Sequence, residues 1–129
     1  MTLPIPPEQV ESLRARVTEL CAPFPEVVAE RWGRSDEHST FAVRGKRFAY
    51  FWADHHDDGR VALIAKAPRG AQADVVDHDP ERFFVPPYLG PSGWVGLRLE
   101  VGEPDWGEVE QILRVAYREQ APARLAREV

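Results

Sequence analysis

The sequence predicts an α+β fold, with one domain over residues 1–129 and a five-stranded antiparallel sheet that carries its helices mainly on one face. Apolar residues repeat at helical spacing near both ends of the chain, while the segments between them alternate in polarity as strands do. Two of these alternating segments are joined by a very short turn, and such turns connect antiparallel neighbours. A chain of 129 residues, 43% of them hydrophobic, is large enough to bury one core.

The N-terminal part of the chain predicts two helices. The first begins at Pro6-Pro7, where proline's missing N–H costs nothing, and ends before Pro23. Its apolar stripe consists of Val10, Leu13, Val17 and Leu20. The segment from Pro25 to Gly33 is expected to form a second, short helix that is closed by a glycine cap.

Three strands are expected next, over residues 40–44, 47–53 and 61–66, and together they form an antiparallel meander. The first two are joined by the tight turn Arg44-Gly45-Lys46-Arg47. A turn cluster, His55-His56-Asp57-Asp58-Gly59, precedes the third strand.

The middle strand of this meander leaves one question open. Alternation places one set of side chains on one face and a second set on the other: Phe48, Tyr50 and Trp52 against Ala49, Phe51 and Ala53. In one interpretation the three aromatic residues face the core. In the other, small alanines lie under a closely packed helix, and the aromatic residues form a platform on the second face of the sheet for a partner or for stacked bases.

The C-terminal half predicts two more strands and a long helix. Residues 70–79 are a weak helix or a loop, residues 82–85 a short strand, and residues 94–101 a long strand. The last helix begins after Asp105, and Glu108 three residues later completes a capping-box pattern. Its apolar stripe consists of Val109, Ile112, Leu113, Ala116 and Tyr117.

The segment from Arg82 to Leu99 is the most specific feature of the sequence. It reads Phe83-Phe84-Val85, then Pro86-Pro87-Tyr88-Leu89-Gly90-Pro91-Ser92-Gly93, then Trp94-Val95-Gly96-Leu97-Arg98-Leu99. With Phe41-x-Val43-x-Gly45-Lys46-x-Phe48 upstream and Ile112-Leu113-x-x-Ala116-Tyr117 downstream, it closely resembles the MmcQ/YjbR family of small bacterial proteins, over roughly residues 7–127. The resemblance implies an α-β3-α-β2-α sandwich, comparable to CyaY-like (frataxin-like) and double-wing domains. It also implies DNA binding, by analogy of fold.

The charge distribution qualifies that implication. The chain carries a net charge of −5, but residues 40–70 hold six basic residues against three acidic ones, a net of +3. The best candidates for nucleic-acid binding are Arg44, Lys46 and Arg47 at the hairpin tip, with Arg60 and Lys66 nearby in sequence. The alternative is a solvated hairpin tip, where Lys and Arg discourage edge pairing. Any DNA binding is therefore expected to be weak and non-specific.

The runner-up function is that of a small adaptor or chaperone-like domain that binds a protein or a small ligand on its sheet face. Tyr88, Trp94 and Arg98 are the candidate residues for that surface. The structural alternative is that the Pro86–Gly93 segment follows one rigid path, because proline fixes φ, and that Tyr88 and Trp94 pack against the core.

Enzymatic activity is not expected, since the chain has neither a Gly-x-Ser-x-Gly elbow nor a glycine-rich phosphate loop. No cofactor and no metal are expected: His55-His56-Asp57-Asp58 consists of metal-ligand types, but adjacent loop residues rarely converge on one ion, and a solvated turn is favoured. The single cysteine, Cys21, is expected to be a buried packing residue.

The sequence contains no apolar run of about 18 residues and no signal-peptide pattern, so a cytoplasmic protein without membrane contact is expected. The oligomeric state is left open.

Overall fold

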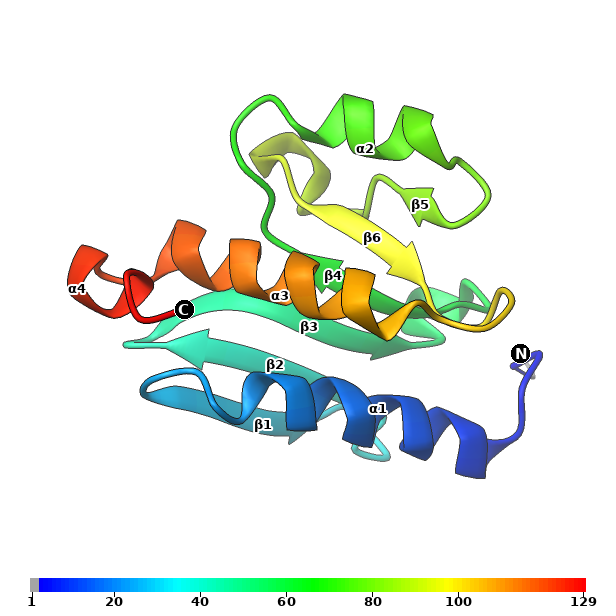
Figure 1. Cartoon of the computed structure of the whole chain (residues 1–129). Coiled ribbons are helices and arrows are strands. Elements are labelled where there is room, and N and C mark those ends of the chain that lie inside the picture. The colour runs from blue at the N-terminus through cyan, green and yellow to red at the C-terminus, as the bar shows by residue number, and fades with distance from the viewer. Residues whose placement is uncertain (1–2) are drawn as a thin grey trace.

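The computed structural model describes residues 3–129; residues 1 and 2 of the expected domain lie outside the described part. Figure 1 shows α1 and α3 side by side across one face of a twisted sheet, with α2 beyond β6. The strands are antiparallel neighbours in the order β1-β2-β3-β4-β6-β5. The elements are α1 (Pro7–Cys21), β1 (Val27–Trp32), β2 (His38–Val43), β3 (Lys46–Ala53), a 3-10 turn (His55–Asp57), β4 (Val61–Ala65), α2 (Gln72–His78), β5 (Phe83–Phe84), a second 3-10 turn (Gly90–Ser92), β6 (Val95–Arg98), α3 (Trp106–Gln120) and α4 (Ala123–Ala126). The α+β class is confirmed, and the described sheet has six strands where five were expected.

The additional strand is β1, which corrects the helix expected between Pro25 and Gly33. All six residues of β1 pair with β2, from Val27 opposite Val43 to Trp32 opposite His38. Glu26, directly before the strand, has a φ of +58°, which a helix start does not allow. The local pattern was compatible with a helix, but pairing with a strand that lies later in the chain decides the conformation.

The β2–β3 hairpin has the tight turn that its sequence predicts. Arg44 and Gly45 both have positive φ, +50° and +79°, the combination found in a type I′ turn. Such a turn matches the twist of the two flanking strands, so it sets the hairpin register.

A bulge in this hairpin overturns the simple alternation expected for β3. Phe41 pairs with Ala49 but Ala42 pairs with Arg47, so Phe48 is the extra residue on β3. Phe48 therefore packs with Ala49 and the other residues of the helix-covered core, and does not share the face of Tyr50 and Trp52.

The main core lies between the sheet and the helices. Tyr117 on α3 is fully buried, and its hydroxyl donates to the carbonyl of Pro25 at 2.6 Å, which ties α3 to the segment before β1. Asp105 caps α3 as expected, since its side chain accepts from the N–H of Glu108 at 3.1 Å. The Glu108 carboxylate does not complete the capping box by accepting from the backbone N–H of Asp105, because it binds Arg82 instead. Within residues 3–129 no helix is long and apolar enough to span a bilayer.

Candidate functional site

The hairpin tip gathers most of the predicted basic residues at one end of the sheet. Arg44, Lys46 and Arg47 are exposed there, and Lys66 lies nearby, because its N–H donates to the Phe48 carbonyl at 3.0 Å. Arg60 lies at the opposite end of β4. The structure thus brings four of the five residues together and separates the fifth.

Several of these cations already have partners within the protein. Both Nε and Nη2 of Arg44 donate to the Glu26 carboxylate at 2.9 Å, and this interaction lowers the pKa of Glu26. The Lys66 Nζ donates to the Ser92 carbonyl at 2.7 Å. The Arg60 guanidinium lies over the ring of Phe84, 4.2 Å from its centroid. Arginine–carboxylate pairs also occur elsewhere: Arg14–Glu11, Arg31–Glu11, Arg82–Asp79, Arg82–Glu108 and Arg98–Glu100.

The side of the sheet away from α1 and α3, here called the outer face, carries the aromatic residues whose orientation was open. Tyr50, Trp52 and Trp94 form a second apolar cluster there, separate from the main core, with Phe84 and Leu89 packed against it. Ala49, Phe51 and Ala53 face the helices. The second of the two interpretations is therefore correct in its sidedness for Tyr50 and Trp52, but not for Phe48, which packs in the main core. The platform is not open, however, because the Val85–Gly93 segment folds over it and leaves Trp94 only 5% exposed.

The three residues predicted for a ligand or partner surface differ in their surroundings. Trp94 is a packing residue, as the structural alternative held, but Tyr88 is 78% exposed, so its expected packing against the core is wrong. The Nε of Arg98 donates to the Glu100 carboxylate at 3.1 Å, and that carboxylate also accepts from the N–H of Val61. Arg98 is thus part of an internal network, and Tyr88 alone of the three presents an open apolar surface.

The histidine cluster after β3 is more than a solvated turn. The His55 ring stacks on Trp52 with centroids 4.0 Å apart, and His38 lies 5.2 Å away. Burial lowers the pKa of both imidazoles, so both are neutral near pH 7. Within residues 3–129, no three His, Cys, Asp or Glu side chains are placed to hold one metal ion together. The absence of a metal requirement remains a prediction.

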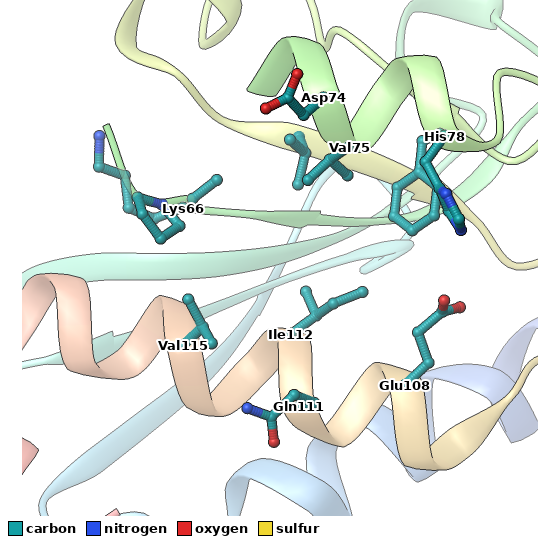
Figure 2. A pocket seen from close by; sticks show the side chains of 12 residues that line it. Lys66, Asp74, Val75, His78, Glu108, Gln111, Ile112 and Val115 are labelled. Atoms are coloured by element: carbon teal, nitrogen blue, oxygen red, sulfur yellow. The ribbon is translucent and has the colours of Figure 1, made fainter. Parts of the chain in front are cut away.

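A cavity of about 470 Å³ between α2 and α3 is the site that sequence reasoning missed (Figure 2). Its floor is formed by the sheet residues Phe83 and Val95, and Figure 2 shows Val75 of α2 facing Ile112 and Val115 of α3 across it. The other lining residues are Lys66, Ala67, Pro68, Asp74, His78, Glu108 and Gln111. The sequence contained a signal for this site: Val75 and Val115 are apolar residues that do not belong to the apolar stripes expected for the helices.

The polar groups of the cavity lie around its apolar walls. Glu108 accepts from Arg82 at 2.9 Å, and Asp79 accepts from the same guanidinium at 2.7 Å, which together raise the pKa of Arg82. Because Arg82 engages the Glu108 carboxylate, that group is a poor general base. The lining includes no Ser, Thr or Cys, so it offers no hydroxyl or thiol nucleophile.

The lone thiol also offers no reactive group. Cys21 is buried at the end of α1, as expected, and burial raises the pKa of its thiol to about 12. A thiol with that pKa is almost entirely protonated at neutral pH, and it is the thiolate that reacts.

Comparison with known proteins agrees with this fold. The model of the family YjbR matches residues 22–119 of the chain. The crystal structure of the Deinococcus radiodurans protein DR2400, assigned to the domain family DUF419, superposes with a TM-score of 0.63 at 20% sequence identity, over 85% of this chain and 76% of that one. At this identity the likeness concerns the fold. The comparison with curated proteins found no match.

Proposed function

This chain belongs to the YjbR family, and we propose that it is a non-enzymatic binding protein whose ligand is a small, largely apolar molecule held between α2 and α3. The observation that carries the proposal is the cavity of about 470 Å³ with apolar walls. This volume falls in the range of about 300–1,000 Å³ that is typical of small-molecule sites. The site therefore differs from the sheet-face surface that the sequence suggested for a ligand.

The chemistry of the cavity supports binding over catalysis. Its walls are mostly aliphatic and aromatic, its Glu108 carboxylate is engaged by Arg82, and its lining contains no Ser, Thr or Cys. Such a lining desolvates an apolar ligand and supplies no hydroxyl or thiol nucleophile. A cytoplasmic location fits this proposal and stays a prediction.

Filling the cavity is expected to abolish ligand binding. Ile112→Trp places an indole between α2 and α3, so the affinity for the apolar fluorophore 8-anilinonaphthalene-1-sulfonate should fall at least ~10-fold, about 1.4 kcal/mol. The measurement is a fluorescence titration of the folded proteins. Glu119→Trp, at an exposed position of α3 outside the cavity lining, is the matched control and should bind as the wild type does. Equal affinity in Ile112→Trp and wild type would exclude the cavity as the binding site.

Weak, non-specific DNA binding is the second candidate, because the hairpin tip exposes Lys46 and Arg47 within a region of net charge +3. The internal partners of Arg44 and Lys66 reduce the charge available to phosphates. Neutralising few phosphates gives a weak complex with a shallow salt dependence.

A charge-reversal experiment tests this second candidate. Arg44→Glu, Lys46→Glu and Arg47→Glu combined should abolish duplex binding, and the wild type should show a slope of about −2 to −4 in a plot of log K against log salt. The control combines Arg16→Glu, Arg34→Glu and Arg127→Glu, which changes the net charge equally at other places. A similar loss of affinity in both triple variants would mean that overall charge, not the hairpin, governs binding. A wild type that does not bind duplex at low salt would exclude DNA.

A further inference from the structure

The outer face of β1, β2 and β3 is exposed at Val28, Glu30 and Arg47, whereas the turn after β3 reaches its other end, where His55 packs against Trp32 and Trp52. Two adjoining hollows lie on it, and both are lined by Glu30, Thr40 and Arg47. Val28 lines one hollow and Trp32 the other. We call this surface the β1–β3 trough. It lies on the opposite side of the sheet from the α2–α3 cavity, so it is independent of the function proposed above.

Half of the exposed large apolar side chains of the described residues line this trough. Within residues 3–129, four large hydrophobic side chains are exposed: Val28, Trp32, Val85 and Tyr88. Two of them line the trough, and the other two lie in the segment that covers the neighbouring part of the outer face. The Trp32 ring packs against His38 with centroids 4.5 Å apart, so it is held in place as a rigid anchor.

The charges of the trough are opposite, close together and not paired with each other. The Glu30 side chain makes no hydrogen bond or ion pair with any of the described residues, although the Glu30 backbone pairs with Thr40. Among the described residues, the Arg47 guanidinium donates only to a neutral group, the Tyr50 hydroxyl, at 3.3 Å. The two residues lie on β1 and β3, on either side of β2, where Glu30 pairs with Thr40 and Arg47 pairs with Ala42.

We propose that the occupant of this trough is a second copy of the same chain. In a twofold interface the same patch meets itself, so it must be complementary to itself. A patch with one free carboxylate, one guanidinium and apolar residues beside them meets this condition: Glu30 of each copy lies opposite Arg47 of the other, and Val28 and Trp32 pack around the two ion pairs. The geometry is that of two sheets stacked face to face. Nucleic acid is a poor occupant, because Glu30 cancels the charge of Arg47 within the trough.

Charge exchange tests the proposal, with sedimentation equilibrium as the measurement and circular dichroism as the check of folding. The wild type should dimerise, and Glu30→Arg or Arg47→Glu alone should raise the dimer Kd at least ~10-fold, because like charges then face each other. Two combinations should restore the dimer: the double variant Glu30→Arg/Arg47→Glu, and an equimolar mixture of the two single variants, which should form a heterodimer detectable by native mass spectrometry. Glu119→Arg, on α3, is the control and should dimerise as the wild type does.

Two results would overturn the proposal. One is a wild type that stays monomeric at several hundred micromolar. The other is a folded double variant whose dimerisation is as weak as that of the single variants. In a self-complementary interface, exchanging both charges brings opposite charges together again, so the affinity must be restored.

Discussion

Replacing Trp94 with alanine is expected to lower the free energy of unfolding by about 3–5 kcal/mol, the usual cost of truncating a large buried aromatic residue. Trp94 is 5% exposed, and its ring lies 5.6 Å from that of Tyr50 in the outer-face cluster. Its carbonyl also accepts from the Gln72 side chain at 2.7 Å, so α2 is anchored at the same place. Truncation leaves a void in the outer-face cluster against which Leu89 packs.

Urea denaturation of the Trp94→Ala variant measures this effect, and Tyr88→Ala provides the control. Tyr88 belongs to the same segment but is 78% exposed, so its removal should change the stability by less than about 0.5 kcal/mol. If Trp94→Ala lowers the free energy of unfolding by less than about 1 kcal/mol, packing of the Val85–Gly93 segment does not depend on this indole.

Gly96→Val is expected to destabilise the protein by about 1–3 kcal/mol through overpacking. A Cβ atom at Gly96 would lie 2.4–2.7 Å from three ring atoms of Phe84, which pairs with it across β5 and β6. The ring cannot move away without cost, since the Arg60 guanidinium lies over it at 4.2 Å. The absence of a side chain at Gly96 is thus what allows Phe84 to lie flat on the outer face.

A double-mutant cycle isolates this contact. In a Phe84→Ala background the obstructing ring is gone, so Gly96→Val should cost little, and the coupling between the two sites should be about 1–3 kcal/mol. The readout is again the free energy of unfolding from urea denaturation. An equal cost of Gly96→Val with and without the Phe84 ring would assign the effect to the backbone of β6 and not to the clash.

The sequence by itself determined the elements that depend on neighbouring residues. The apolar stripe of α1, the Asp105 cap of α3 and the Arg44-Gly45 turn are all local features, because each is set by side chains or backbone angles within a few residues. Burial of Trp94 does not belong to this group, because its ring packs against Tyr50 and Trp52 of β3, which lie far from it in the sequence.

The tertiary structure alone decided what depends on residues far apart in the chain. β1 is a strand because β2 pairs with it, although its local pattern fits a helix. The bulge at Phe48 separates this ring from Tyr50 and Trp52, and strict alternation cannot reveal a single extra residue.

The candidate sites depend on long-range geometry in the same way. Glu26 neutralises Arg44 across 18 positions in the sequence, and the α2–α3 cavity is walled by helices that are separated by β5 and β6. Charge pairing and cavity shape are properties of surfaces that meet only after folding. They therefore cannot be predicted from the local residue pattern or the composition.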